Sequence, residues 1–444
     1  MYPRKRLGYV ICLVALLMVT GRVLAQSQPS GQSSHQLLGS PASGYPPDRP
    51  VGSFWAKGQR DLLYVASPAT HHSKNAAGIY VFDVWDHFNF IKRIHTFDYP
   101  AWQDTEAADE VKGIAISSVT GRLYLGTLTG LTAFDLFTEK PLWTEKVDGT
   151  GSDRLAISPD GKLLYVPKRD AEGWVVVDAD TGKEIKKIYT ESTHHPHNTI
   201  YGLDGSRVFG QASESRYLNV FDTKDHTTVQ KVGPFGTEKE LAYTMQQARD
   251  NKSKPLITKP FTVNGKGTLV FVTVNGLMGF EVGDVRTGKV IARVEVTGYP
   301  WTREQVHGEG FPSHGIALSP DETEIWLTDN VHGVLHIFDA TVMPPKQVSA
   351  VTLPYRLGPG ESEGRAYPYW LTMGLDGKYV YASTGDVIDR ATRQVVAALT
   401  DELGRPVRSE KIIEVLWVDG KPVRNSDQFG RGMVTGDSSS VSSR

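Results

Sequence analysis

Histidine side chains carry the clearest chemical signal in this 444-residue sequence. They gather in a few connecting segments, at His71, His72, His194, His195, His197, His307, His314 and His332. Imidazole nitrogens suit copper, zinc, iron or nickel, and nearby carboxylates such as Glu309, Glu361 or Glu363 could complete a ligand shell. We consider a transition metal, copper or zinc, held by His195, His197 and His314, with Glu309 transferring protons. The alternatives are that these histidines bind a small ligand or serve the structure alone.

A second group of side chains has the chemistry of a small-molecule site. Its members supply aromatic walls and guanidinium groups: Trp301, Arg303, His307, Arg365, Tyr367, Tyr369 and Trp370. This combination fits a carboxylated, phosphorylated or sugar-like ligand. The structural alternative is that the aromatic rings fill the space between neighbouring sheets. Two further charged pairs, Asp153 with Arg154 and Lys168 with Arg169, are either ligand contacts or solvated pairs.

Several other chemistries find little support in the sequence. The single cysteine, Cys12, lies in the N-terminal apolar segment, which leaves the rest of the chain without disulfides, thiolate ligands or cysteine-linked haem. A Gly-x-Ser-x-Gly nucleophile motif is absent. Oxygen ligands for a calcium-dependent lactonase exist at Glu106, Asn198, Asn275 and Asp329, although such residues are common on any loop-rich surface.

The N-terminus has the pattern of a cleavable export signal. Arg4, Lys5 and Arg6 precede an apolar run that ends at Ala25, which predicts a signal peptide over residues 1–25 and a periplasmic or secreted protein. An uncleaved anchor is the alternative. Removing this segment would change the net charge from −2 to −6 by taking away these three residues and Arg22. The resulting acidic balance argues against nucleic-acid binding, and no membrane span would follow cleavage.

The remaining chain divides into a leader, one repeating domain and a tail. Residues 26–50 are rich in Ser, Gln, Pro and Gly, and residues 433–444 are rich in Ser, so we expect both segments to be disordered. Between them, hydrophobic-Asp pairs recur at intervals of about 40 to 60 residues, at Asp83, Asp135, Asp178, Asp222, Asp284, Asp339 and Asp389. Each pair ends the third apolar strand of a unit, and almost no helical pattern occurs. The sequence therefore predicts an all-β fold, a seven-bladed β-propeller of four-stranded blades over residues 51–432.

The amino-acid sequence of these repeats resembles that of the YVTN-type bacterial propellers. The resemblance rests on three segments, Ser158-Pro159-Asp160-Gly161 with Tyr165-Val166, Val177-Asp178 with Thr181-Gly182, and Ser319-Pro320-Asp321. It extends over roughly residues 55–400. The resemblance implies a propeller fold and leaves activity open, since this broad group includes binding proteins, lactonases, and haem or quinone enzymes. Blades 1, 5 and 7 depart from the repeat.

Strand direction assigns the connections to two rims of the propeller. We call the rim where the first strand of each blade begins the near rim, and the opposite one the far rim. The short Asp-Gly and Thr-Gly turns belong to the far rim. The long connections belong to the near rim, at residues 96–110, 189–198, 233–259, 298–313 and 354–369. Long loops in a compact domain are often functional, and the clustered histidines also map to this rim.

Two additions to the repeat are also expected. Thr237 and Glu240 form a capping box followed by Leu241, Met245 and Ala248, which predicts a short helix lying on the near rim. After the seventh blade, an apolar run over residues 412–418 and an Asp-Gly turn predict a hairpin beside the junction of the first and last blades. Such a hairpin would cover an open sheet edge.

Three functions are compatible with these features. The first is an exported, monomeric propeller whose near rim and central funnel bind a small molecule or an exported protein. The second is a hydrolase or oxidoreductase with a histidine-bound metal in the funnel. The third is a purely structural or interaction protein in which the histidines play no chemical part.

Overall fold

The computed structural model describes residues 49–67, 78–96, 111–147, 151–168, 171–189, 193–307, 310–357 and 363–435. The chain separates into two units, Met1–Gln36 and Leu37–Arg444, and all described residues belong to the second. The predicted signal peptide, most of the leader and the last nine residues lie outside the described part. None of the described helices is long and apolar enough to cross a membrane.

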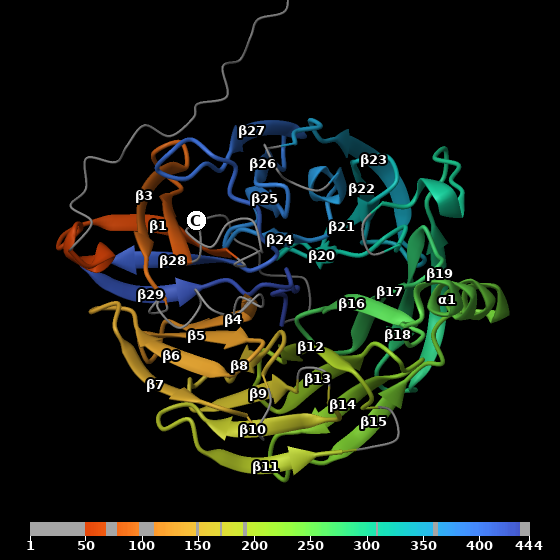
Figure 1. Ribbon diagram of the computed structural model, residues 1–444, viewed down its shortest axis with the longest axis horizontal. Coiled ribbons are helices and arrows are strands. Elements are labelled where there is room, and N and C mark those ends of the chain that lie inside the picture. The colour runs from red at the N-terminus through yellow and green to blue at the C-terminus, as the bar shows by residue number, and fades with distance from the viewer. Residues whose placement is uncertain are drawn as a thin grey trace, which may run out of the picture. The chain divides into compact units, whose positions relative to one another are not determined.

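Seven antiparallel sheets are arranged around a common axis (Figure 1), which confirms the predicted propeller. The innermost strands are β28 (Ile412–Val418), β4 (Val111–Ser117), β8 (Ala156–Ile157), β12 (Pro196–Tyr201), β16 (Thr258–Val263), β20 (Ile316–Leu318) and β24 (Leu371–Met373). The second strands are β1 (Gln59–Ser67), β5 (Arg122–Thr127), β9 (Leu163–Pro167), β13 (Arg207–Ala212), β17 (Leu269–Val274), β21 (Glu324–Asp329) and β25 (Tyr379–Ala382).

The outer half of each blade consists of the third and fourth strands. The third strands are β2 (Gly78–Asp83), β6 (Leu131–Asp135), β10 (Trp174–Asp178), β14 (Leu218–Asp222), β18 (Gly279–Asp284), β22 (Val334–Asp339) and β26 (Asp386–Asp389). The outermost strands are β3 (Asn89–Ile94), β7 (Pro141–Glu145), β11 (Glu184–Ile188), β15 (Thr228–Val232), β19 (Lys289–Glu295), β23 (Lys346–Thr352) and β27 (Gln394–Ala398). All seven predicted Asp positions end a third strand.

The repeated aspartates have a structural task. After Asp135, its Oδ1 accepts hydrogen bonds from the backbone N–H groups of Phe137 and Thr138, at 2.9 and 2.7 Å. Equivalent contacts with one or both of the following N–H groups occur at the other six aspartates. An Asp side chain that bonds the backbone two residues on stabilises a tight turn. The repeated Asp therefore starts the turn between the third and fourth strands.

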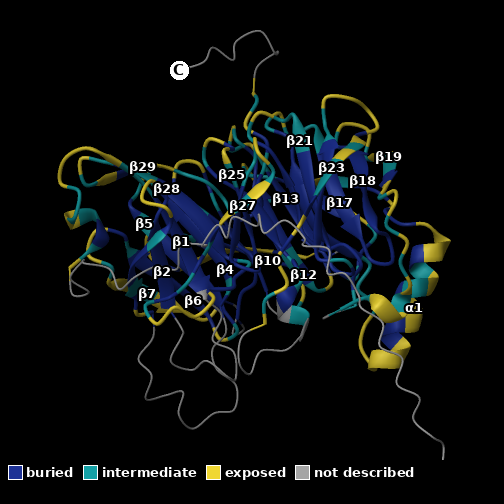
Figure 2. Ribbon diagram, turned by 90° about the horizontal axis from the view of Figure 1, so that it is seen from above, coloured by how far each residue is buried: buried dark blue, intermediate teal, exposed yellow. Residues whose placement is uncertain are grey.

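The core consists of seven apolar clusters, one at each interface between neighbouring blades of the described structure. Strand alternation explains the arrangement, because successive side chains point to opposite faces of a sheet. In β1, Leu62 and Tyr64 pack toward blade 2, whereas Leu63 and Val65 pack toward blade 7. Both faces of a blade are therefore buried, as Figure 2 shows for the strands.

The predicted C-terminal hairpin is present and closes the ring. β28 pairs with β1 and takes the place that the innermost strand has in the four-stranded blades, and β29 (Lys421–Asn425) pairs with the other edge of β28 as a fifth strand. The first blade is therefore assembled from both ends of the propeller domain. This pairing covers the edge that β1 would otherwise leave open.

The segment after β29 crosses the axis toward the far rim. The Gly430 carbonyl accepts from Leu318 N, the Gly432 N–H donates to Val263, and the Met433 N–H donates to Pro320. Phe429 is buried within the cluster between blades 4 and 5. These contacts extend just beyond residue 432, where the sequence predicted the domain to end.

Helix α1 (Glu238–Asn251) and three short 3-10 helices, η1 (Val51–Ser53), η4 (Arg303–Gln305) and η5 (Glu363–Ala366), complete the described elements. The predicted capping box at the start of α1 is present, with Thr237 as N-cap. The predicted helix is present; of the residues that indicated it, Ala248 is buried and Met245 is 47% exposed, and the buried residues also include Glu240 and Gln247. Glu240 can be buried because its carboxylate forms an ion pair with the Arg293 guanidinium at 3.0 Å.

Candidate functional site

The near-rim end of the axis brings together charged side chains from five blades. They lie at or just before the start of the innermost strands, at Asp153, Arg154, His197, Lys259, His314, Glu410 and Lys411. We call these seven residues the axial cluster. Arg154 and Asn198 form a parallel bridge, which shows directly that neighbouring innermost strands run in the same direction. Residues distant in the sequence therefore meet because these strands begin at the same rim.

Close backbone packing helps to assemble the cluster. Gly113 in β4 lies against the main chain of Asp153 and Arg154, where an added Cβ would be 2.5 Å from the Asp153 carbonyl oxygen. Gly315 packs in the same way against Trp370, with an added Cβ 2.8 Å from its Cα. Glycine is required at such approaches because any side chain would force the strands apart.

His197 is held between a carboxylate and a guanidinium. Its Nδ1 lies 2.6 Å from Asp153 Oδ2, and its Nε2 lies 3.1 Å from an Arg154 guanidinium nitrogen. A guanidinium only donates and a carboxylate only accepts, so the neutral ring carries its proton on Nδ1. Burial lowers the pKa of His197 to about 4, and Asp153 offsets only part of this shift. The ring is therefore neutral near pH 7, with both nitrogens engaged.

Arg154 connects three blades at this point. Its guanidinium donates to Asp153 Oδ1 at 3.2 Å and pairs with Glu410, which also lies 3.3 Å from the Lys411 ammonium. The same guanidinium lies 4.4 Å from the ring centroid of Trp370, close enough for a cation–π interaction. Burial opposes ionisation of Glu410, but Lys411 and Arg154 outweigh it and hold the pKa of Glu410 well below its usual range.

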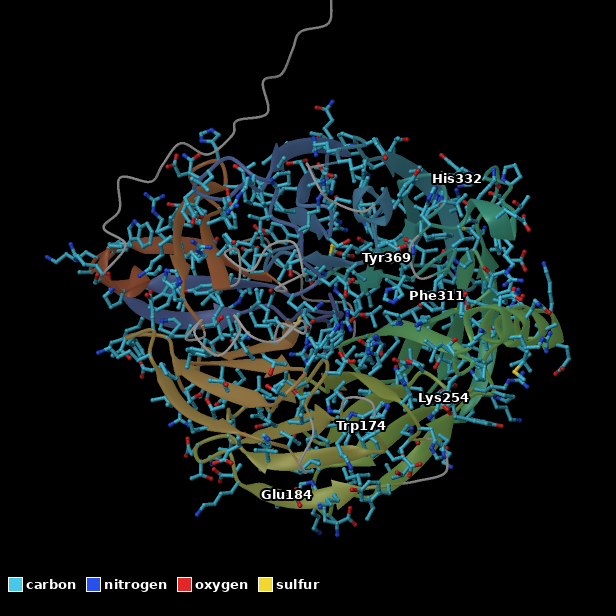
Figure 3. All side chains as sticks on the ribbon, in the orientation of Figure 1. Trp174, Glu184, Lys254, Phe311, His332 and Tyr369 are labelled. Carbon is cyan, nitrogen blue, oxygen red and sulfur yellow. The ribbon has the colours of Figure 1, made fainter. Side chains whose placement is uncertain are left out.

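Lys259 and His314 complete the cluster. Lys259 Nζ lies 3.5 Å from the ring centroid of Phe311, and its charge contributes to the lowered pKa of His197. His314 Nδ1 donates to the main-chain carbonyl of Tyr369 at 2.9 Å. Figure 3 shows Tyr369 and Phe311 closer to the centre of the ring than His332. The cluster thus occupies the mouth of the axis and not the outer rim.

Buried cations converge in the axial cluster. Arg154, Lys259 and Lys411 are each less than 10% exposed, and the carboxylates of Asp153 and Glu410 lie beside Arg154. Buried cations are stabilised by an opposite charge close to them. A carboxylate, phosphate or sulfate group entering from the near rim could supply such a charge.

The sequence grouped His195 with His197 and His314, but the structure places it in a different environment. His195 and His194 line a near-rim groove of about 440 Å³ together with Glu172, Glu214 and Lys254. His194 Nδ1 is 2.9 Å from Glu172, and His195 Nδ1 is 3.9 Å from Glu214. His197 and His314 belong to the axial cluster instead.

The predicted metal site therefore gains no support from the described residues. Within the described ranges, no three His, Cys, Asp or Glu side chains are grouped so that they could hold a metal ion. Glu309, the predicted proton-transfer group, lies outside the described residues, as do His71 and His72. Metal binding stays a prediction.

The predicted aromatic group is divided among three places. Trp301 and Arg303 contact Tyr243 of α1, with a Trp301–Tyr243 centroid distance of 5.9 Å, and Arg303 also pairs with Asp250. His307 stacks on Tyr367 at 3.8 Å and accepts a bond from the Tyr369 hydroxyl through its carbonyl. Trp370 reaches the axial cluster through its ring, and Tyr369 reaches it through the carbonyl that accepts from His314. The side chain of Arg365 is outside the described part.

Lys259, Glu410 and Lys411 were missed by the sequence argument. One positional pattern could have identified them. Each lies at the position where Arg154, His197 and His314 also lie, within two residues of the start of an innermost strand. Glu410 and Lys411 further required recognising that β28 is itself an innermost strand.

Comparison with known proteins supports the fold and no more. No family model matches the chain, and no curated protein matches it. Among solved structures, a chain of a mitotic checkpoint complex superposes with a TM-score of 0.51 at 12% identity, covering 82% of this chain and 95% of that one. The YVTN family is therefore not confirmed.

Two other solved structures have similar architecture. Hydrazine synthase from Kuenenia stuttgartiensis has a TM-score of 0.48 at 17% identity, covering 73% of this chain and 89% of that one. The propeller domain of Myceliophteria thermophila Cps50 (Swd1) has a TM-score of 0.48 at 12% identity, covering 66% and 86%. At these identities the likeness concerns the fold alone.

Proposed function

We propose that this propeller binds a small anionic molecule in the axial cluster at the near rim. The observation that carries the proposal is the convergence of Arg154, Lys259 and Lys411, buried cations from three blades. Arg154 is fixed by Asp153, Glu410 and the Trp370 ring, so it contributes a preorganised charge. His197 is neutral near pH 7 and contributes no charge of its own.

Binding of simple anions tests the proposal. Isothermal calorimetry with inorganic phosphate and with succinate, beside uncharged succinamide, is expected to show saturable binding of at least one anion and none of succinamide. Replacing Lys259 by Met should weaken that binding about tenfold or more, because a hydrogen bond to a charged group contributes about 1.5–3 kcal/mol. Lys259→Arg should keep most of the affinity.

Lys254→Met is the matched control. Lys254 is also a near-rim lysine, but its side chain is 73% exposed and lies in the groove beside Glu214, whereas Lys259 is 2% exposed. The control should leave anion affinity unchanged. Equal losses in both variants, or no binding of either anion to the wild type, would refute the proposal.

We also propose that the protein is exported. The support is the basic cluster at Arg4–Arg6 and the apolar run ending at Ala25. N-terminal sequencing of protein recovered from the periplasm or the medium should begin at Gln26. Recovery of the intact N-terminus there would instead favour the uncleaved anchor.

A further inference from the structure

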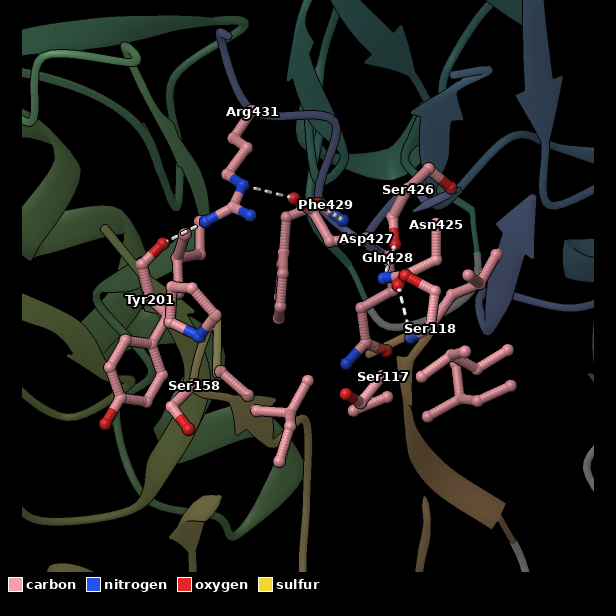
Figure 4. A pocket seen from close by; sticks show the side chains of 18 of the residues that line it. Ser117, Ser118, Ser158, Tyr201, Asn425, Ser426, Asp427, Gln428, Phe429 and Arg431 are labelled. Atoms are coloured by element: carbon pink, nitrogen blue, oxygen red, sulfur yellow. Dashed lines mark hydrogen bonds and ion pairs between the residues drawn. The ribbon is translucent and has the colours of Figure 1, made fainter. Parts of the chain in front are cut away.

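The far-rim end of the axis contains a cavity that the sequence did not predict. Its volume is about 320 Å³, within the range of small-molecule sites. The walls are the far-rim ends of β4, β8 and β12 and the C-terminal segment from Val423 to Arg431 (Figure 4). Gln428 and Phe429 separate it from the axial cluster, since Trp370 Nε1 donates to the Gln428 carbonyl on the other side.

One polar atom of the cavity is left without a partner. Gln428 is 1% exposed, and its side-chain Nε2 donates to the Leu155 carbonyl at 3.3 Å. Its Oε1 is buried and accepts no hydrogen bond within the described structure. A buried carbonyl oxygen without a donor is costly, so a donor supplied by a ligand would be favourable.

Ser158, another polar residue of the walls, is already engaged. Its Oγ donates to Asp160 at 2.6 Å and accepts the Lys162 and Leu163 N–H groups, which fixes it in the far-rim turn. These bonds leave Ser158 little capacity for a ligand. Gln428 Oε1, which is buried and lacks a donor, is the acceptor best suited to orient a bound molecule.

None of the charged side chains in the described walls is buried. Arg431 lies 2.9 Å from Asp427 and donates to the Tyr201 carbonyl, whereas Arg424 is exposed and donates to Leu375 O at 3.1 Å. The described walls therefore lack the buried cations that the axial cluster contains. Apolar side chains such as Ile157, Ile200 and Phe429 form much of the remaining surface.

We infer that the far-rim cavity binds a small uncharged molecule, largely apolar, with one N–H or O–H group that donates to Gln428 Oε1. An apolar group that displaces disordered water from such a cavity gains affinity. The unpaired Gln428 Oε1 favours a ligand that can donate a hydrogen bond to it over one that cannot. This site is independent of anion binding at the near rim, because it lies at the other end of the innermost strands and uses different residues.

Indole and benzothiophene are a matched pair of probes, since they have similar shape but only indole has an N–H donor. Calorimetry on the full chain should show that one indole binds per protein and that benzothiophene binds with about tenfold lower affinity. Gln428→Met removes the acceptor and keeps a side chain of similar length. It should lower the affinity for indole about tenfold and leave the affinity for benzothiophene unchanged.

A second variant tests the place of binding. Val423 is 48% exposed and lines the cavity, so Val423→Trp should narrow it and abolish binding of both probes. Val229→Trp is the control, because Val229 is also 48% exposed but lies on the outermost strand β15. Phosphate binding should be unaffected by all three substitutions.

The outcomes are decisive even if Gln428→Met fails to fold. Absence of saturable indole binding to the wild type would show a cavity that holds water only and would overturn the inference. Equal affinity of the wild type for the two probes, or unchanged binding in Val423→Trp, would overturn it as well.

Discussion

The two ends of the propeller axis are built in different ways from the same strands. At the near rim, the residues that begin the innermost strands differ from blade to blade and include Arg154, His197, Lys259 and Lys411. At the far rim, the strands end in repeated turns, and one segment, residues 426–435, crosses between them. The near end contains buried charges contributed by several blades, whereas the far end is closed by a single segment of the chain.

This difference separates the residues that specify the fold from those that can specify function. The Ser-Pro-Asp turns and the strand-ending aspartates are occupied by bonds to their own backbone, as Ser319 and Asp321 show. Residues outside the repeat, at the strand starts and in the C-terminal segment, form the two candidate sites. Fold and candidate function therefore use different positions of the same unit.

Removing the crossing segment should have the largest effect, because one piece of chain serves several blades. Truncation after Asn425 would remove Phe429, whose loss alone costs about 3–5 kcal/mol, and several hydrogen bonds worth about 1 kcal/mol each. We expect the free energy of unfolding to fall by more than about 5 kcal/mol in urea titrations. Truncation after Thr435 keeps all these contacts and is the control. Equal stability of the two truncated proteins would contradict a closing role.

The buried carboxyl group of Glu414 should make the protein less stable as the pH rises. Glu414 of β28 is buried, and its Oε2 accepts from the Tyr381 hydroxyl at 2.7 Å. Burial raises the pKa of Glu414 to about 8, and Asp61 and Asp376 add to the shift. The folded state therefore keeps a proton that the unfolded state loses above its pKa of 4.5. The stabilisation that this proton provides is present in full below pH 4.5 and is lost as the pH rises to about 8.

Glu414→Gln isolates this effect, since the amide can still accept from Tyr381. Between pH 5 and 8 the unfolding free energy of the wild type, relative to the variant, should fall by roughly 1.4 kcal/mol per pH unit, or about 4 kcal/mol. Urea titrations at several pH values measure the difference. Parallel curves for the two proteins would show that Glu414 is ionised in the folded state.

The sequence predicted the fold because the relevant signals are local and repeated. Each strand-ending Asp lies two or three residues from the backbone groups that it bonds, so spacing alone reveals the seven blades. The C-terminal hairpin was found from its own pattern, but its place as the innermost strand of blade 1 depends on pairing with β1, more than 300 residues away along the chain. The pattern of α1 predicted the helix, but not that Glu240 and Gln247 would make polar contacts with Arg293 and the Gly310 carbonyl.

The candidate sites were only partly predictable. Strand direction correctly put His197 and His314 on the same rim, and topology alone cannot tell that His195, two residues earlier, faces a separate groove. The convergence of Arg154, Lys259 and Lys411 emerges only when the starts of several strands are seen together. The far-rim cavity depends on where residues 423–431 cross the axis, and no local pattern encodes that path.

The smallest effect that we predict concerns the near end, which should lose stability in acid. The pKa of His197 is about 4 in the folded state, mainly through burial, against 6.5 for an unperturbed ring. The unfolded state therefore takes up a proton between these values while the folded state does not. Stability from this group is complete above pH 6.5 and falls by up to about 3 kcal/mol as the pH drops to 4.

His197→Gln provides the comparison, because its amide can donate to Asp153 and accept from Arg154 without titrating. The unfolding free energy of the wild type, relative to this variant, should decrease between pH 6.5 and 4, opposite in direction to the Glu414 difference. Urea titrations across this range measure it, and a constant difference would mean that the folded state protonates His197 freely. Opposite pH slopes at the two residues would show that the near and far ends are distinct electrostatic environments within one set of strands.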